Sequence, residues 1–281
     1  MFKLMNDCRA SQLINSFIQT CNISSRLDIE LLFMHVLEID KNILYRDDPL
    51  LTNLELERIK KLIEKRETGE PIAYLTNNTG FWNLDLYVNR QVLVPRPETE
   101  VLVQNVLEGF NSERISVLDL GTGSGAVGLS LAKDRPDWLV TCSDISLDAL
   151  KVASINMIRN STNVKLVNTD WLNSFKPNYF DVIVSNPPYI NSSDPRIFSD
   201  GLKHEPLEAL VSDSEGLGDI KKIIQQGSKI LKDKGCLFLE HGYDQSDKVI
   251  DIFKGYGFSS IQSHKDLNGH DRVCVGQLNK C

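Results

Sequence analysis

The sequence lacks the features of a membrane-spanning, secreted or broadly basic protein. Its apolar runs are much shorter than a spanning helix, and polar residues such as Lys3, Asp7 and Arg9 interrupt the first 21 positions. We therefore expect no membrane span and no secretion signal. The net charge of −7 provides no overall basic field for nucleic acid, which leaves only a local basic face as a route to such binding.

Cysteine and histidine are also sparse and scattered. The six cysteines form no C-x-x-C pair, and the five histidines form no H-x-x-x-H pair, so we expect neither zinc, another metal nor disulfides. Cys142, Cys236 and Cys274 fall inside apolar segments, where they are expected to pack as small apolar side chains. With 281 residues, 41% of them hydrophobic, the chain fits a cytoplasmic globular protein of one or two domains.

Residues 1–75 are predicted to form a small helical domain. Apolar residues recur at helical spacing, as in Leu13, Ile14 and Phe17. Thr52-Asn53-Leu54-Glu55 is a capping box, so a helix should begin there and end before Gly69. The segment shows no chemistry of its own, which leaves partner binding or a stabilising appendage as its roles.

The period changes to two after this helical region. Apolar residues alternate with polar ones from Gly80 onward, which predicts a half-buried strand with Gln91–Val94 as its hairpin partner. A rigid, charged link, Pro95–Glu100, follows. We therefore assign 76–100 to a β-hairpin and linker, and 101–281 to a separate domain.

Short apolar strands alternate with helices from Ile115 onward. This pattern predicts an α/β fold with a doubly wound, mostly parallel sheet of seven strands. The long mixed stretch from Ile190 to Gly218 is typical of a lid or binding loop. The expected strands lie near 116–120, 139–143, 164–168, 180–185, 235–240, 259–264 and 271–277, and the helices near 125–134, 146–158, 218–232 and 244–256.

The first strand of this sheet runs into the glycine-rich turn Gly121-Thr122-Gly123-Ser124-Gly125, and a helix follows. Glycines let the backbone turn tightly and approach a ligand closely, with helix N–H groups facing it. Gly123-x-Gly125-x-x-Gly128 also satisfies the dinucleotide fingerprint, so NAD binding stays open at this point.

Acidic residues end the next two strands. Asp144 is placed to accept hydrogen bonds from both hydroxyls of a ribose, or alternatively to cap the helix that begins near Ser146. Asp170-Trp171 could meet an adenine amino group and ring face, or Trp171 could pack beneath the loop. With Asp119, these residues fall at the carboxyl ends of successive parallel strands, where ligands of open α/β sheets bind.

The fourth strand, Phe180–Val184, stops at Asn186-Pro187-Pro188-Tyr189. Proline cannot continue a central ladder and pushes Asn186 into an extended conformation. The amide oxygen of Asn186 and the carbonyl of Pro187 could both accept from one planar NH2 group, while Tyr189 stacks on its face. The alternative is a plain proline-rich turn. With the glycine turn and the acids, the tetrapeptide predicts a nucleoside site with an amide-recognising corner.

These motifs together resemble the release factor glutamine methyltransferase family, within the class I S-adenosylmethionine-dependent methyltransferases. The resemblance spans nearly the whole chain. One departure is Asn77-Asn78-Thr79-Gly80, where the family usually has Gly and an acidic residue; it leaves the hairpin geometry in doubt. The matching segments are Gly69–Leu75, Phe81-Trp82, Val94–Glu100, Asp119–Gly125, Ser185–Ile190, Glu205-Pro206 and Ala209-Leu210.

The resemblance implies methyl transfer from S-adenosyl-L-methionine to the glutamine side-chain amide of the Gly-Gly-Gln motif in class I peptide chain release factors. It implies a cytoplasmic monomer. Asn186, Pro187 and Tyr189 would be catalytic, and with Pro188 they would bind the substrate. The cofactor would lie against Gly121, Thr122, Gly123, Ser124, Gly125, Asp144, Trp171 and Asn186.

Several points stay open. Arg96 and Glu98 either border the site or form a structural clamp between the domains. Glu205 is either a lid contact or a solvated acid. Glu240, at a strand end, is assigned a structural role. The main alternative function is an N6-adenine-type DNA or RNA methyltransferase, which would need a basic groove. An NAD-dependent dehydrogenase and a non-catalytic S-adenosylmethionine sensor are the others.

Overall fold

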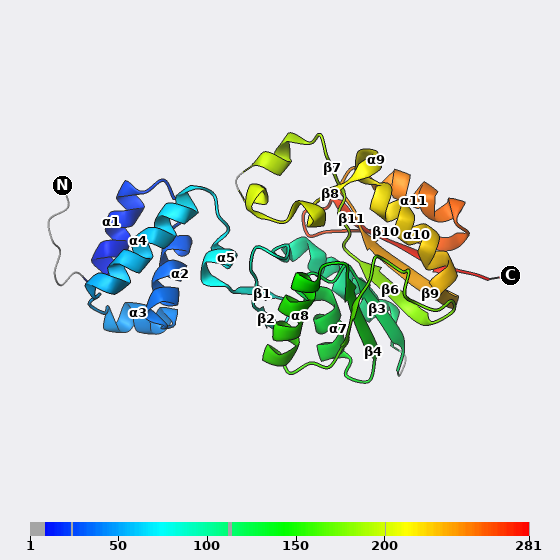
Figure 1. Ribbon diagram of the computed structural model, residues 1–281, viewed down its shortest axis with the longest axis horizontal. Helices are drawn as coiled ribbons and strands as arrows, with labels where there is room; N and C mark the ends of the chain where they lie inside the picture. The colour runs from blue at the N-terminus through cyan, green and yellow to red at the C-terminus, as the bar shows by residue number, and fades with distance from the viewer. Residues whose placement is uncertain (1–8, 24, 112–113, 200, 281) are drawn as a thin grey trace. The chain divides into compact units, whose positions relative to one another are not determined.

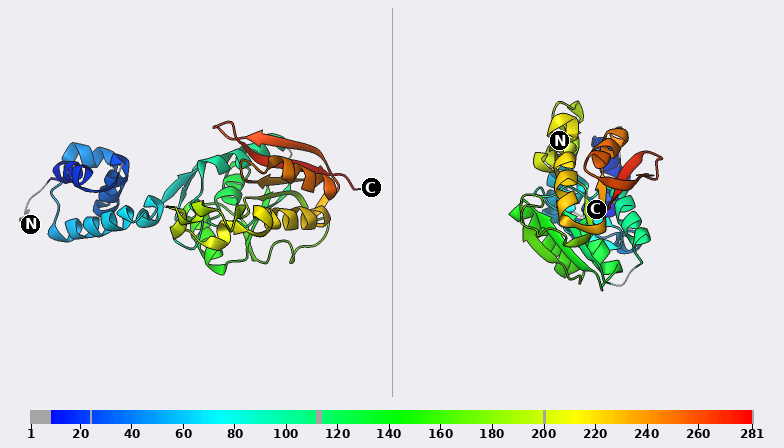
Figure 2. Two further views of the ribbon diagram at one scale, coloured as in Figure 1. Left: turned by 90° about the horizontal axis from the view of Figure 1, so that it is seen from above. Right: turned by 90° about the vertical axis from the view of Figure 1, so that its right-hand side faces the viewer.

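The computed structural model describes residues 9–23, 25–111, 114–199 and 201–280. The chain divides into two compact units, coloured along the chain in Figures 1 and 2. The first comprises Met1–Asn77 with Phe198–His204, and the second comprises Asn78–Ile197 with Glu205–Cys281. The short segment Phe198–His204 therefore belongs to the helical unit, although it lies far along the chain.

The first unit is a helical bundle, as the sequence predicts. Its core contains Ile14, Leu32, Phe33 and Ile59, all nearly inaccessible to solvent. The capping box is confirmed: the Glu55 N–H donates to Thr52 Oγ1, and the Thr52 N–H donates to the Glu55 carboxylate. The helices are α1 (Ala10–Thr20), α2 (Arg26–Leu37), α3 (Lys41–Asp47), α4 (Asn53–Glu67) and α5 (Ile72–Thr76).

The hairpin prediction is only partly right. The hairpin consists of β1 (Thr79–Phe81) and β2 (Leu84–Leu86), with Trp82 at φ +54° in the turn. Gln91–Val94 is irregular backbone, so its assignment as the pairing strand is wrong. The alternation misled because it runs unbroken through the tight turn, and because Val92 and Val94 are buried by packing without ladder pairing.

The second unit contains a seven-stranded sheet in the order β10-β11-β9-β6-β3-β4-β5. All neighbouring pairs are parallel except those of β11, which is antiparallel to β9 and to β10. The predicted doubly wound, mostly parallel α/β fold is confirmed. The strands are β3 (Ser116–Leu120), β4 (Leu139–Asp144), β5 (Lys165–Asn168), β6 (Phe180–Ser185), β9 (Leu231–Glu240), β10 (Phe258–Lys265) and β11 (Asp271–Leu278).

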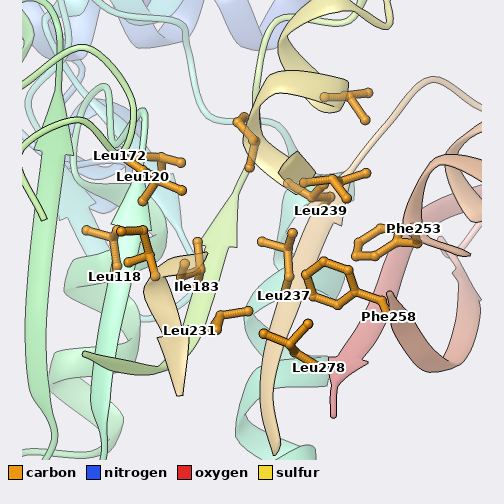
Figure 3. Packing of buried hydrophobic residues seen from close by; sticks show 14 of the residues in the cluster. Leu118, Leu120, Leu172, Ile183, Leu231, Leu237, Leu239, Phe253, Phe258 and Leu278 are labelled. Carbon is orange, nitrogen blue, oxygen red and sulfur yellow. The ribbon is translucent and has the colours of Figure 1, made fainter. Parts of the chain in front are cut away.

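Helices cover both faces of this sheet. The helices α10 (Gly218–Ile230) and α11 (Ser246–Gly255) pack on one face, and α6 (Glu100–Gly109), α7 (Ala126–Asp134) and α8 (Leu147–Arg159) belong to the other layer. Figure 3 shows the core on the first face, to which Leu118, Ile183 and Leu237 of three strands and Phe253 of α11 contribute. Burying one such side chain stabilises the fold by about 1.5–3 kcal/mol, so this layer holds the strand ends in place.

The predicted lid segment consists of short elements. The strands β7 (Ile190–Asn191) and β8 (Val211–Ser212) pair in parallel and close the segment at its base. Between and after them lie the 3-10 turns η2 (Pro195–Phe198), η3 (Leu202–His204) and η4 (Leu207–Ala209) and the turn α9 (Asp213–Gly216). No helix in the described ranges has the length and apolar character needed to cross a membrane.

Candidate active site

The strand order places a topological switch point between β3 and β6. The chain passes from β3 to β4 and β5 on one side, and β6 then pairs on the other side of β3. Leu120 at the end of β3 is the register partner of Ser185 at the end of β6. The glycine turn after β3 and the Asn-Pro-Pro segment after β6 therefore begin side by side, where open α/β sheets bind ligands.

The glycine turn needs glycine for its backbone conformation. Gly121, Gly123 and Gly125 have φ values of +71°, +55° and +86°, in the left-handed region that other residues avoid. The buried Asp119 braces the turn, because its Oδ2 accepts from the Gly128 N–H at 2.8 Å and from the Thr122 hydroxyl. Burial raises the pKa of Asp119 to about 6, against these hydrogen bonds.

Gly128 packs closely against Asp119 and Cys142, where no side chain would fit, and this gives a prediction about stability. A Cβ there would lie 2.3 Å from Cys142 Sγ and 2.9 Å from Asp119 Oδ2. We expect Gly128→Ala to lower the free energy of unfolding by about 1–3 kcal/mol through overpacking, as measured by denaturant titration.

Gly255→Ala is the matched control, since nothing lies within 4 Å of a Cβ at that helical position. It should be neutral or slightly stabilising. Equal stability of the two variants would show that Gly128 is not packed as described.

Asp144 ends β4 and closes over the glycine turn. Its Oδ2 accepts from the Gly123 N–H at 2.9 Å, and its Oδ1 accepts from the Ser146 N–H at 2.9 Å. Burial raises its pKa, with the backbone donors opposing that shift. The helix cap proper is Ser146, whose hydroxyl accepts from the Ala149 N–H. Each carboxylate oxygen still has lone-pair capacity for a ligand.

Trp171 stands over the glycine turn. Its ring would lie 3.5 Å from a Cβ at Gly121, and its Nε1 donates to Asp219 at 3.1 Å. The Ser212 hydroxyl donates to the other oxygen of Asp219, which ties the ring to the end of the lid segment. Trp171 has φ +46°, so the contacts of its side chain hold a strained backbone. Trp171 thus packs over the glycine turn, and it also lines the cavity described below.

Asn186 is held by a contact that the sequence gives no hint of. Its Nδ2 donates to Thr99 Oγ1 at 3.1 Å, across 87 positions of the chain. Tyr189 is only partly exposed, and its hydroxyl donates to Glu240 Oε1 at 3.3 Å. Asn186, Pro187 and Pro188 line the cavity described below, and Tyr189 packs behind them against the core.

Glu205 belongs to a buried link, so its reading as a solvated acid is wrong. It is 5% exposed; its Oε2 accepts from the Val94 N–H at 3.1 Å, and its other oxygen pairs with Arg96. Burial raises the pKa of Glu205, while Arg96 opposes the shift. This ion pair joins the link peptide to the lid beside Pro206, which lines the cavity.

A cavity of about 690 Å³ joins these features, a size suited to a nucleoside-containing ligand. All but one of the predicted cofactor residues line it; the exception is Gly125, where a Cβ would instead meet Leu129 and Ala153. Thr169 Oγ1, also on its wall, is buried without a hydrogen-bond partner among the described residues. The described residues hold no cluster of three or more potential metal ligands. Its lining includes Thr99, Gly121, Thr122, Gly123, Ser124, Asp144, Ile145, Thr169, Asp170, Trp171, Asn186, Pro187, Pro188, Pro206 and Val211.

Two family models match the chain. The model described as PrmC N-terminal domain covers residues 12–76, and the model described as methyltransferase small domain covers residues 97–203. The first match runs from within α1 to the end of α5, and the second contains the glycine turn and Asn186-Pro187-Pro188-Tyr189.

Curated relatives match over nearly the full length. Proteins named release factor glutamine methyltransferase are 41% identical in Buchnera aphidicola subsp. Schizaphis graminum, 40% in Pseudomonas aeruginosa and 37% in Escherichia coli. Each alignment covers 90% of this chain and 92%, 93% and 92% of the respective relative.

Solved structures match the fold at lower identity. A methyltransferase from Pyrococcus furiosus aligns over 82% of this chain and 100% of its own, with a TM-score of 0.55 and 18% identity. The T. Thermophilus 16S rRNA N2 G1207 methyltransferase, solved with AdoMet and guanosine, aligns over 72% of this chain and 50% of its own, with a TM-score of 0.53 and 18% identity. At this identity the likeness concerns the fold alone.

Proposed function

The chain belongs to the release factor glutamine methyltransferase family, and on that premise we propose that it methylates a glutamine side-chain amide of a protein substrate. The methyl donor is S-adenosyl-L-methionine. The acceptor is the glutamine of the Gly-Gly-Gln motif in class I peptide chain release factors. The observation that carries the proposal is the placement of an acid-braced glycine turn beside Asn186-Pro187 across one strand pair.

The cavity residues suit this cofactor. Gly121 and Gly123 provide a floor without side chains, and Asp144 offers a carboxylate to the two ribose hydroxyls. Trp171 presents an aromatic ring for adenine, and the unpartnered hydroxyl of Thr169 provides a further polar contact. Bound here, S-adenosylmethionine would supply an electrophilic methyl group on a sulfonium.

The acceptor corner addresses the weak nucleophilicity of an amide. The nitrogen lone pair is delocalised into the carbonyl group, so orientation and electrostatic stabilisation must supply much of the rate. The Asn186 side-chain oxygen and the Pro187 carbonyl accept one amide hydrogen each, and Tyr189 borders the amide plane. The amide nitrogen would bond to the methyl carbon as the bond between that carbon and the donor sulfur breaks, and one N–H proton would then pass to water.

We assign substrate docking to the helical unit, residues 1–75, and methyl transfer to residues 101–281, with the hairpin and linker 76–100 between them. The PrmC N-terminal match supports the first assignment, since it lies outside the cavity residues. A monomeric state and a cytoplasmic location stay predictions.

Mass spectrometry tests the proposed reaction. Purified release factor incubated with enzyme and S-adenosylmethionine should gain about 14 Da on its Gly-Gly-Gln peptide. This is the mass of one CH2 group, the net change when a methyl group replaces a hydrogen. A release factor with alanine at that glutamine is the control and should gain nothing. Methylation of adenine in DNA or RNA instead would favour the alternative function.

A further inference from the structure

Glu240, which the sequence marks only as a strand end, holds a buried carboxylate behind the acceptor corner. It ends β9, pairs with Val273 of β11 in register, and is 1% exposed. Its Oε1 accepts from the Tyr189 hydroxyl at 3.3 Å, whereas its Oε2 accepts no hydrogen bond from any residue that the structure describes. A buried carboxylate with an open oxygen is costly, so this one calls for an explanation.

Thr99 lies between this carboxylate and Asn186. It ends η1 (Pro97–Thr99) and is 3% exposed, yet it lines the cavity. Its Oγ1 accepts from Asn186 Nδ2 at 3.1 Å. A hydroxyl that accepts one hydrogen bond can still donate one. The Thr99 hydroxyl also lowers the pKa of Glu240, although Oε2 of that carboxylate has no hydrogen-bond partner among the described residues.

The contact decides which way the Asn186 amide points. An asparagine amide can present either its oxygen or its NH2 group after a half-turn about its last bond. Asn186 can accept from a substrate NH2 group only if its own NH2 group points elsewhere. Thr99 Oγ1 provides that acceptor.

We infer that Thr99 and Glu240 are positioning residues of the acceptor corner: Thr99 fixes the Asn186 amide with its oxygen toward the glutamine substrate, and Glu240 fixes the Tyr189 ring. This inference rests on the proposed function. The contact of Glu240 is the hydrogen bond that its Oε1 accepts from the Tyr189 hydroxyl. Glu240 does not touch the reacting atoms. A substitution of Glu240 should therefore change the turnover rate and leave the affinity for the cofactor nearly unchanged.

The charges around Glu240 make the support sensitive to pH. Burial raises the pKa of Glu240 to about 7, and the charge of Glu98 acts in the same direction. The Thr99 hydroxyl, Arg272 and the Tyr189 hydroxyl act in the opposite direction. The ionised form is the one that can accept from both hydroxyls. Protonation as the pH falls through about 7 therefore removes the support, and kcat should fall with it.

Three variants test the inference by kcat, KM and cofactor affinity in the methyl transfer assay. Thr99→Val removes the hydroxyl at nearly constant volume and should lower kcat at least tenfold, while Thr99→Ser should restore most of the loss. Glu240→Gln should lower kcat to a similar degree and abolish the decline near pH 7. The Kd for S-adenosylmethionine, measured by calorimetry, should stay within about twofold of the wild-type value for each variant. This is well below a tenfold change, which corresponds to about 1.4 kcal/mol.

Thr141→Val, at another buried threonine, on β4, controls for the loss of a hydroxyl from the fold. The inference is overturned if Thr99→Val keeps wild-type kcat, or if Glu240→Gln keeps the wild-type pH profile. A wild-type enzyme that leaves release factor unmethylated would instead contradict the proposed function. Circular dichroism melting of each variant separates a loss of folding from a loss of positioning.

Discussion

Asn186→Ala should lower kcat for release factor methylation by about a hundredfold to a thousandfold. The substitution removes the side-chain oxygen proposed to accept one amide hydrogen and to stabilise charge developing on the nitrogen, an effect of the size found for single preorganised groups in acyl transfer. Affinity for S-adenosylmethionine should change little, because the glycine turn, Asp144 and Trp171 remain. Single-turnover kinetics with saturating cofactor measures the loss.

Asn191→Ala is the matched control for this variant. Asn191 lies in the same segment after β6, and its side-chain oxygen accepts only from Ser193 in the contacts described. It should retain near wild-type kcat. If Asn186→Ala turns over as fast as this control, the acceptor role of Asn186 is wrong.

Asp144→Asn should raise the Kd for S-adenosylmethionine about 10- to 100-fold. The substitution removes the charge that strengthens hydrogen bonds from ribose hydroxyls, and hydrogen bonds to charged groups contribute about 1.5–3 kcal/mol. Isothermal titration calorimetry gives the Kd directly. Asp148→Ala, at an exposed acid in the first turn of α8, should bind as the wild type does.

A cofactor analogue separates the two functions open to Asp144. The carboxylate also braces the turn through Gly123 and Ser146, so a loss of affinity could come from a loosened loop. The 2′,3′-dideoxy analogue of S-adenosylmethionine cannot use the proposed contact. Asp144→Asn should therefore weaken its binding much less. An equal loss for both ligands would assign Asp144 to bracing alone.

The strands and the cavity floor could be predicted from the sequence because their signals are local. A buried parallel strand such as Phe180–Ser185 appears as an apolar run, and the turn after it contains prolines that end the ladder. The turn Gly121–Gly125 needs positive φ at three positions, and glycine marks each of them.

The supporting contacts could not be predicted because their partners come from distant parts of the chain. Asn186 finds Thr99 across 87 positions, and Glu205 binds the Val94 N–H across 111. No spacing rule connects such pairs, and single acids on irregular segments resemble solvated surface residues. The prediction of Gln91–Val94 as a hairpin strand failed for a different reason: the alternating pattern is present in the sequence, but the ladder pairing ends at Leu86.

The insertion of β11 between β9 and β10 has a consequence for the order in which the protein folds during synthesis. The strands that surround the cofactor side, β3, β4 and β5, leave the ribosome early and pair with one another through local crossovers. The edge of β9 that carries Glu240 stays unpaired until β11 has been made. A nascent chain can therefore pair β3, β4 and β5 before β9 gains its neighbour β11, with an open strand edge exposed to other chains in the interval.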